Sequence, residues 1–306
     1  MTTMTPLIIL GCGYIGGYVA RAALAAGRPV RVCGRSTGKL AALGELGAQV
    51  KYVDAAMTKQ LWPALAGMRG GTVLYSIPPI GSLPPGEGPR KALQAAAAGG
   101  LDCFVHLSSC GLYGHDPDDD VWIDDDTPVA VDDQGMVGVR NDEDAVRTST
   151  FGVRTVTLRL APVYGPGRGV RPRLLAGKYR LLDDGAHAIS RIHVDDVTQL
   201  VFAAEARAAH GATYLVADAE PTTQRAYATW LCERLGLPLP ASRALLEPGK
   251  PRGSHRNRKV KGDRILADLG VTLRYPTFRD GEAAIEAAEA AEAGTPVESP
   301  GPEPAA

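Results

Sequence analysis

The chain has 306 residues, of which 45% are hydrophobic, and its 33 basic residues nearly balance its 34 acidic residues. This length fits about two average domains, or one large α/β unit with an appendage, and the apolar content allows a sizeable core. The charge balance argues against a dedicated nucleic-acid-binding protein, and no apolar run approaches the roughly 20 residues that a membrane helix needs.

Short apolar runs alternate with helical patterns through the first half of the chain. Strands are predicted over residues 7–10, 30–33, 50–53, 72–76, 103–107 and 155–160, and helices over 15–26 and about 37–46. Alternation of this kind implies βαβ units and a parallel sheet. Residues 7–10 form a continuous apolar run, which is typical of a parallel strand buried on both faces. We therefore predict an α/β fold with a Rossmann-type, doubly wound parallel sheet.

The second half is less regular and begins with a Gly/Pro-rich break at 165–169. Helices are predicted over 194–207, 222–235 and 281–293, and a strand over 213–217. Thr222 or Thr223 is the expected N-cap of the second of these helices, and Gly236 ends it. The predicted organisation is a dinucleotide-binding domain over 1–165, a smaller, mainly substrate-binding α/β region over 166–293 that returns one strand to the sheet, and a disordered tail over 294–306.

A GxGxxG turn joins the first strand to the first helix and reads Gly11-Cys12-Gly13-Tyr14-Ile15-Gly16. Gly11 permits the tight turn, Gly13 lets the backbone approach a pyrophosphate, and Gly16 lets the helix lie close to the sheet. The helix N-terminus then offers N–H groups and partial positive charge to the phosphates. The alternative is a tight turn that binds no ligand.

The residues after the second strand bear on which dinucleotide binds. An NAD site usually has an acidic residue about 20 positions beyond the glycine turn, for the ribose 2′-hydroxyl. This chain has Cys33-Gly34-Arg35-Ser36 there, with no carboxylate. A guanidinium suits a 2′-phosphate, and one charge-assisted bond of about 1.5–3 kcal/mol gives a roughly ten- to hundredfold preference. We predict NADP(H) in preference to NAD(H), the alternative being that Arg35 is only a solvated charge.

Further segments follow the glycine turn in a defined order. They read VD at residues 53–54, HLSSCGLYG at 106–114, DTP at 126–128, LRLAPVYGPG at 158–167 and IHVDDV at 192–197. Together with the glycine turn they resemble the extended short-chain dehydrogenase/reductase superfamily, of the NAD-dependent epimerase/dehydratase type. The resemblance runs from about Leu7 to Asp280. It implies cofactor contacts at Asp54, Ser76, Pro162 and Val163.

The same resemblance implies a catalytic Ser or Thr, a Tyr and a Lys, in which Tyr exchanges the proton and Lys lowers its pKa. Ser109 falls at the Ser/Thr position. The expected YxxxK signature is absent, so that Met136 takes the Tyr position and Arg140 the Lys position. A thioether cannot exchange a proton, and the chain therefore looks most like the atypical branch of the superfamily. Arg140 would position the nicotinamide ribose, and the proton would come from water, the substrate or Tyr113.

Other polar features have competing interpretations. Tyr113 and Tyr164 belong to backbone motifs and favour structural roles, His193 is expected to cap a helix, and Cys110 is a candidate nucleophile without an evident activating base. The aspartate-rich segment 115–126 is interpreted as a solvated surface loop, with a cation site as the alternative. The basic segment 252–264 is interpreted as the rim of a substrate cleft, with a solvated loop or a nucleic-acid contact as the alternatives. We predict no metal site.

The predicted function is that of an NADP(H)-dependent oxidoreductase, epimerase or dehydratase acting on a small polar or nucleotide-linked substrate. The alternative is a non-catalytic NADP(H)-binding redox sensor or scaffold, which Met136 favours. No nucleic acid or membrane partner is expected, and a homodimer is a further expectation from the resemblance. The five cysteines form no CxxC pair and the N-terminus lacks signal-peptide features, so a cytoplasmic protein with reduced thiols is predicted.

Overall fold

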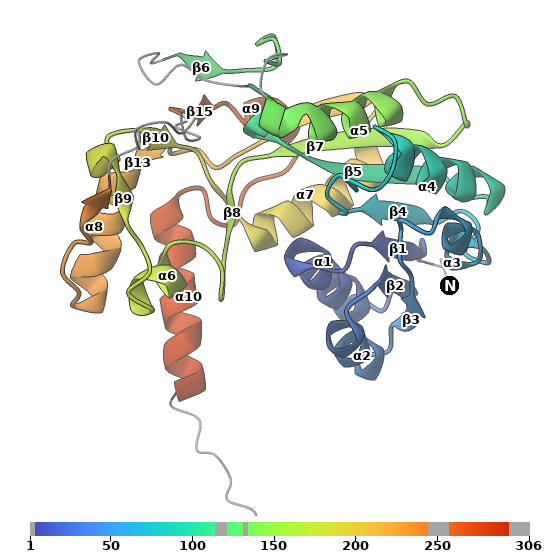
Figure 1. Cartoon of the computed structure of the whole chain (residues 1–306). Coiled ribbons are helices and arrows are strands. Elements are labelled where there is room, and N and C mark those ends of the chain that lie inside the picture. The colour runs from blue at the N-terminus through green and yellow to red at the C-terminus, as the bar shows by residue number, and fades with distance from the viewer. Residues whose placement is uncertain (1–3, 114–120, 131–133, 244–256, 294–306) are drawn as a thin grey trace, which may run out of the picture.

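The computed structural model of the chain describes residues 4–113, 121–130, 134–243 and 257–293. Its centre is a seven-stranded sheet in the order β12-β7-β5-β4-β1-β2-β3, in which every neighbouring pair is parallel (Figure 1). These strands are β1 (Leu7–Leu10), β2 (Val30–Gly34), β3 (Gln49–Tyr52), β4 (Thr72–Tyr75), β5 (Cys103–Ser109), β7 (Arg154–Leu160) and β12 (Ala212–Val216). The strand order reverses between β1 and β4, and a crevice for a ligand is expected beyond the carboxyl ends of these strands.

Helices cover both faces of the sheet, as a doubly wound fold requires. One core joins the sheet to α1 (Tyr14–Ala25), α2 (Thr37–Glu45), α7 (Val194–Arg207) and α9 (Asp263–Leu269). The other joins it to α3 (Leu61–Leu65), α4 (Glu87–Ala98) and α5 (Val137–Arg147). All four side chains of β1 are buried, which confirms the prediction from its continuous apolar run.

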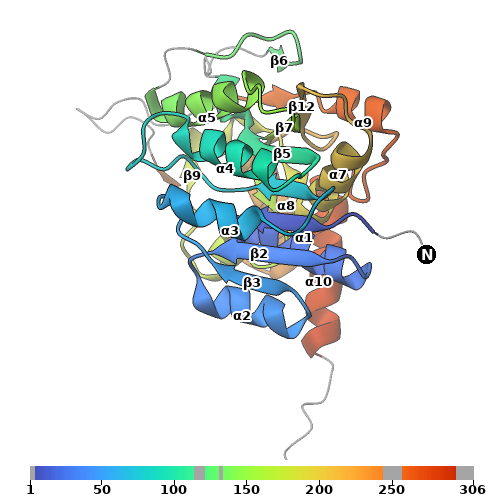
Figure 2. The same ribbon diagram turned by 90° about the vertical axis from the view of Figure 1, so that its right-hand side faces the viewer.

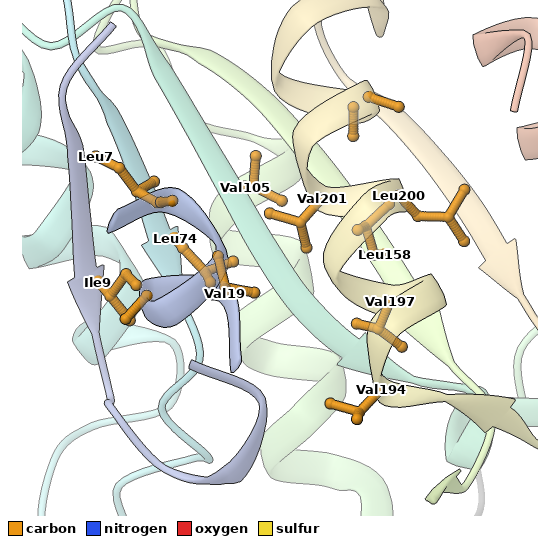
Figure 3. Packing of buried hydrophobic residues seen from close by; sticks show 14 of the residues in the cluster. Leu7, Ile9, Val19, Leu74, Val105, Leu158, Val194, Val197, Leu200 and Val201 are labelled. Atoms are coloured by element: carbon orange, nitrogen blue, oxygen red, sulfur yellow. The ribbon is translucent and has the colours of Figure 1, made fainter. Parts of the chain in front are cut away.

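Helix α7 shows how the apolar spacing determines the packing. Val194, Val197 and Val201 recur every three or four residues and are fully buried. Figure 3 shows Val201 beside Val105 of β5, with Val197 and Val194 further along the same helix, and all three belong to one buried cluster with Leu158 of β7. The predicted bounds of this helix, 194–207, match the structure.

A smaller second lobe follows β7 and lies beside the carboxyl side of the sheet (Figures 1 and 2). Its helices are α6 (Arg171–Leu175), α8 (Gln224–Leu235) and α10 (Phe278–Ala293). Short strand pairs complete it and the neighbouring loops: β8 (Val163–Tyr164) with β11 (Ile192–His193), β9 (Leu181–Leu182) with β14 (Ser242–Arg243), β10 (Ala188–Ile189) with β13 (Thr222–Thr223), and β6 (Trp122–Ile123) with β15 (Lys259–Val260). The 3-10 turns are η1 (Thr58–Gln60), η2 (Cys110–Tyr113), η3 (Gln134–Met136) and η4 (Asp183–Gly185).

Aromatic packing holds the second lobe together. Phe278, at the start of α10, is fully buried, and its ring centroid lies 4.7 Å from that of Tyr227 and 5.5 Å from that of Trp230. Helix α8 begins two residues later than predicted, and Thr223 caps it by accepting the Ala226 N–H at 3.1 Å. Gly236 ends the helix in the left-handed conformation, as predicted.

Several predicted features lie outside the described residues. They are the tail at 294–306, residues 114–120 of the aspartate-rich segment, and Arg252 and Arg256 of the basic segment. The predicted return of a strand from the second half of the chain is observed, because β12 pairs with β7 at the edge of the sheet.

Candidate functional site

A cavity of about 620 Å³ opens at the point where the strand order reverses. We call it the glycine-turn cavity. Its lining comes from the carboxyl ends of four strands and the turns that follow them: residues 10–13, 33–36 with Lys39 and Leu40, 53–56, and 76–82. Of the predicted cofactor contacts, the structure brings together Gly11, Cys12, Gly13, Arg35, Asp54 and Ser76 at this cavity.

The three glycines of the turn have distinct geometric requirements. Gly11 has φ +91°, and a Cβ there would lie 2.7 Å from the Ser76 carbonyl oxygen. A Cβ at Gly16 would lie 2.7 Å from the carbonyl oxygen of Gly11, so only glycine lets α1 approach this closely. A Cβ at Gly13 would meet nothing within 4 Å. The backbone at Gly13 is therefore open to a ligand, as the pyrophosphate of a dinucleotide requires.

Helix α1 presents its N-terminus to this cavity. Gly13 is the N-cap, and no acidic side chain in the first turn neutralises the partial positive charge of the helix. The Tyr14 hydroxyl donates to the carbonyl of Pro166 at 3.1 Å, while half-buried Ile15 packs against the core. Tyr14, Ile15 and Gly16 do not line the cavity themselves, and what they offer towards it is the set of backbone N–H groups in the first turn of the helix.

Two cations stand on the β2 side of the cavity. Arg35 follows β2, and Lys39 lies one helical turn further on in α2. Both are exposed, and among the described residues neither makes an ion pair or a side-chain hydrogen bond. Asp54 lies after β3, where one of its carboxylate oxygens accepts the Ala56 N–H at 3.0 Å. Lys39 was not predicted from the sequence, and it lines the cavity because α2 begins at Thr37, directly after the turn that carries Arg35.

The remaining predicted site residues do not line this cavity: Ser109, Tyr113, Arg140, Pro162 and Val163. The half-buried Ser109 ends β5, and its hydroxyl accepts the Gly111 N–H at 2.9 Å. Arg140 lies on α5, with Nη1 3.4 Å from the Ala130 carbonyl oxygen. Met136 is the N-cap of α5, one turn before Arg140, so these two residues are spaced as the family's Tyr and Lys would be.

A buried group of polar side chains, the carboxylate network, lies beneath Ser109 and comprises Ser108, Tyr113, Glu143 and Arg159. The register of β5 and β7 places Ser108 opposite Arg159. The Ser108 hydroxyl donates to Glu143 at 2.7 Å, and Arg159 Nε donates to the same carboxylate at 3.0 Å. Arg159 also donates to the Tyr113 hydroxyl. Sequence patterns did not predict this pairing, because Glu143 and Arg159 lie on different elements.

Tyr113 is therefore held by the network. Burial raises the pKa of Tyr113, although the adjacent Arg159 charge opposes this, so its hydroxyl stays protonated at neutral pH. The Arg159 guanidinium also lies over the Tyr113 ring, 5.2 Å from its centroid. These contacts indicate a structural role for the side chain.

Two other candidates from the sequence, Cys110 and His193, also make contacts that indicate structural roles. Cys110 is fully buried, its thiol donates to the Arg159 carbonyl at 3.0 Å, and burial raises its pKa to about 12. The His193 side chain caps α7 by accepting the Asp195 N–H at 3.2 Å, and burial lowers its pKa to about 4. Neither residue has the activated state that a nucleophile or a neutral-pH base needs.

The described parts of the acidic and basic segments pair with each other. Arg264 contacts Asp125 at 2.7 Å, and Lys261 approaches Asp124 at 3.8 Å. Arg264 and Asp125 also line a small hollow together with Tyr113 and Arg159, and the role of the basic segment as the rim of a substrate cleft stays a prediction. Within the described part of the chain, no group of His, Cys, Asp and Glu is arranged to hold a metal ion, and no helix is long and apolar enough to cross a membrane.

Known proteins share this architecture and sequence pattern. Residues 86–217 match the model of the NAD dependent epimerase/dehydratase family. The 3-diazoavenalumate denitrifying reductase of a Streptomyces species is 30% identical over 213 residues, which span 64% of this chain and 68% of that protein.

Solved structures extend the likeness over nearly the whole chain. A conserved protein of unknown function from Silicibacter pomeroyi DSS is 29% identical, with a TM-score of 0.78 over 93% of this chain and 99% of that one. DesIV, a dTDP-glucose 4,6-dehydratase from Streptomyces venezuelae with NAD and TYD bound, has a TM-score of 0.79 over 95% of this chain and 98% of that one. Since its identity is only 21%, this last match supports the fold alone.

Proposed function

The chain belongs to the NAD-dependent epimerase/dehydratase family, and from that membership we propose that it is an NADP(H)-dependent oxidoreductase acting on a small polar substrate, nucleotide-linked substrates included. The observation that carries the proposal is the glycine-turn cavity, with an open backbone at Gly13 and two cations without partners among the described residues, Arg35 and Lys39. The Streptomyces relative is itself named a reductase, which favours hydride transfer as the overall reaction.

The preference for NADP(H) rests on the charges around the ribose position. Two exposed cations line the cavity on the β2 side, and no acidic residue occupies the position where an NAD site has its carboxylate. Asp54 lies across the cavity, after β3, where the resemblance to the family implies an adenine contact. A 2′-phosphate would gain about 1.5–3 kcal/mol from one charge-assisted hydrogen bond to Arg35.

The chain's own residues supply positioning rather than a strong acid or base. When bound, the nicotinamide ring supplies or accepts the hydride. Ser109, at the end of β5, would hold the reacting oxygen of the substrate, and Arg140 would hold the ribose hydroxyls next to the ring. Since Met136 stands at the Tyr position and Arg159 donates to Tyr113, the proton would come from water or from the substrate itself.

Met136 also supports a second candidate function, a non-catalytic NADP(H)-dependent redox sensor. A thioether neither gives nor takes a proton, so loss of the acid/base group would leave cofactor binding intact. A sensor requires that NADP⁺ and NADPH produce different conformations or partner affinities. Amide hydrogen exchange, measured for the NADP⁺ complex and for the NADPH complex, tests this function. A sensor should show different exchange in the two complexes.

The test is a calorimetric titration of the full chain with NADP⁺ and, separately, with NAD⁺. We expect NADP⁺ to bind at least tenfold more tightly, and Arg35→Ala to weaken NADP⁺ by ten- to a hundredfold while NAD⁺ changes by less than twofold. Lys51→Ala is the matched control, because this exposed cation lies on β3 but does not line the cavity. A substrate screen that follows NADPH oxidation would then use Ser109→Ala, which should retain cofactor binding and lose turnover.

Two outcomes would overturn the proposal. If neither nucleotide binds, the glycine turn is a structural element without a ligand, and the oxidoreductase and sensor functions both fail. If NAD⁺ binds more tightly than NADP⁺, the oxidoreductase class remains but the assigned role of Arg35 is wrong.

A further inference from the structure

Five polar side chains are buried where the second lobe meets the sheet, and we call them the junction cluster. They come from five different parts of the chain: Tyr164 from β8, Arg191 before β11, Asp218 after β12, Tyr227 from α8 and Glu282 from α10. Each of them is 5% exposed or less. The cluster lies outside the glycine-turn cavity and shares no residue with the carboxylate network.

The members of the junction cluster contact one another across these elements. The Arg191 guanidinium lies over the Tyr227 ring, 4.1 Å from its centroid, and the Tyr227 hydroxyl donates to Glu282. A Cβ at Gly281 would overlap the Tyr164 hydroxyl, so α10 packs directly against β8. Tyr164 and Tyr227 also belong to the hydrophobic core of the second lobe. The cluster therefore joins the segments that leave the sheet to both long helices of the lobe.

The two carboxyl groups of the cluster lack hydrogen-bond partners and counter-charge. Among the described residues, neither oxygen of Asp218 has a hydrogen-bond partner, and Oε2 of Glu282 has none either. Arg191 supplies one positive charge, and the nearby cation Arg171 is already paired with Glu289 at 2.6 Å. A second buried negative charge would cost several kcal/mol, whereas a protonated carboxyl group carries no charge. One proton bound by the cluster would therefore balance it.

Asp218 is the carboxyl group at which we expect this proton. Burial raises its pKa to about 7, against the opposing effects of the Arg191 charge and of the backbone N–H groups of Arg191 and Glu220, which approach the carboxylate without completing a hydrogen bond. The other groups that face Asp218 are the Tyr164 hydroxyl and the partly exposed Glu220 carboxylate. Glu282, in contrast, accepts a hydrogen bond from a phenol, which favours its charged form.

We propose that the junction cluster is a proton-dependent latch between the sheet and the second lobe, closed while Asp218 is protonated and open once Asp218 has released its proton to water. In the open form the carboxylate would be hydrated and would no longer need a buried counter-charge. The lobe lies beside the carboxyl ends of the parallel strands, where ligands bind in folds of this kind, so opening would change access to that edge (Figure 1). The latch requires no bound cofactor and is independent of the proposed function.

The direction of the pH effect follows from the two environments of Asp218. Its pKa is about 7 in the closed junction and about 4 in water. Opening therefore becomes more favourable by up to about tenfold per pH unit between about pH 4 and pH 7, and changes little above that range. The closed form is the more stable one at acidic pH.

Amide hydrogen exchange followed by mass spectrometry measures opening in each lobe separately. The protection factors of α8 and α10 are compared with those of α1 and α4, for the full chain without nucleotide, at about pH 5 and about pH 7.5. We expect the protection of α8 and α10 to fall at least about tenfold over this interval, while that of α1 and α4 changes by less than about threefold.

A matched pair of variants assigns the effect to one carboxyl group. Asp218→Asn keeps the size of the side chain but cannot ionise, so α8 and α10 should stay protected at both pH values. Glu220→Gln removes the neighbouring carboxylate, which pairs with Arg279 at the surface, and should respond to pH as wild type does.

Three outcomes would overturn the inference. If α1 and α4 lose protection in parallel with α8 and α10, Asp218 acts on the whole fold and there is no latch. If the protection of α8 and α10 in wild type is the same at both pH values, the closed junction holds no proton. Both outcomes come from wild type alone, so they do not require Asp218→Asn to fold. If Asp218→Asn folds and keeps the wild-type pH response, another group binds the proton and the assignment to Asp218 is wrong.

Discussion

The polar residues of the glycine-turn cavity and those of the carboxylate network differ in what they contact. Arg35 and Lys39 are exposed and have no partner among the described residues. Arg159 and Glu143, in contrast, have side chains only 16% and 8% exposed and bind each other. The first arrangement leaves charge available for a ligand, and the second uses charge to join β5, β7 and α5.

This difference helps to separate side chains available to a ligand from side chains used by the fold. A free cation at the edge of a cavity contributes little to folding but can contribute fully to binding. A buried ion pair contributes to folding mainly because removing one partner leaves the other desolvated. The glycine-turn cavity therefore keeps charged side chains available for a ligand, whereas the polar groups of the carboxylate network stabilise the fold.

The largest expected effect comes from breaking the carboxylate network. Glu143→Ala leaves Arg159 without its buried counter-charge and Ser108 without its acceptor, so we expect a loss of about 3–5 kcal/mol of unfolding free energy. Urea denaturation measures this loss. Asp144→Ala is the control, since its exposed ion pair with Arg147 should contribute less than about 1 kcal/mol. If the two substitutions lower the free energy of unfolding equally, the carboxylate network contributes no more to stability than an exposed ion pair.

Asp218, two residues after β12, is a buried carboxylate that does not belong to the carboxylate network. It is 2% exposed, and burial raises its pKa to about 7, although the Arg191 charge opposes this. Because the folded-state pKa lies above the usual value, the fold favours the protonated form. Ionisation of Asp218 should therefore lower the stability of the folded state progressively between about pH 4 and pH 7, and have no such effect below that range.

Asp218→Asn should therefore stabilise the protein by up to about 4 kcal/mol at pH 8 and change it little at pH 4. The control is Asp196→Asn, because Asp196 accepts the backbone N–H groups of Arg274 and Tyr275 at 2.6 and 3.1 Å. That substitution should destabilise at both pH values. Thermal melting of both variants at pH 4 and pH 8 measures these effects. If Asp218→Asn destabilises the protein at pH 8, the fold needs this carboxylate in its charged form.

Substitutions at two glycines of the turn should have different effects, one on stability and the other on cofactor binding. Gly11→Ala introduces a side chain at φ +91° and a contact of 2.7 Å with the Ser76 carbonyl oxygen, so we expect a loss of about 1–3 kcal/mol of stability. Gly13→Ala meets nothing within 4 Å and should leave stability within about 1 kcal/mol. It should still weaken NADP⁺ at least tenfold, because its methyl group occupies space open to the ligand. Unchanged NADP⁺ binding by Gly13→Ala would place the pyrophosphate elsewhere.

The smallest effect is expected at Tyr113. Tyr113→Phe removes one acceptor of Arg159, which keeps its bonds to Glu143, so a loss of about 1 kcal/mol is expected. Once a substrate is found, turnover should fall less than threefold and its pH profile should not shift, because the raised pKa of Tyr113 keeps the hydroxyl protonated. A hundredfold loss of turnover would make Tyr113 the proton donor after all.

The sequence by itself determined the local features of this protein. The apolar run of β1, the glycine spacing of the turn and the Thr223 cap each depend on residues within a few positions of one another. Backbone conformation and helix periodicity act over that same short range. For this reason the seven strands and the helices α1, α2, α7, α8 and α10 were predictable, whereas the sequence patterns did not predict α4.

Only the tertiary structure decided which polar side chains meet. Arg264 reaches Asp125 across 139 residues of sequence, and Glu143 meets Arg159 because α5 packs over β5 and β7. Lys39 and Arg21 share a groove because α1 and α2 lie side by side on one face of the sheet. A sequence does not give the distances between its charged side chains. Whether a cation is neutralised or remains available for a phosphate depends on separations that only the packed helices and the strand register set.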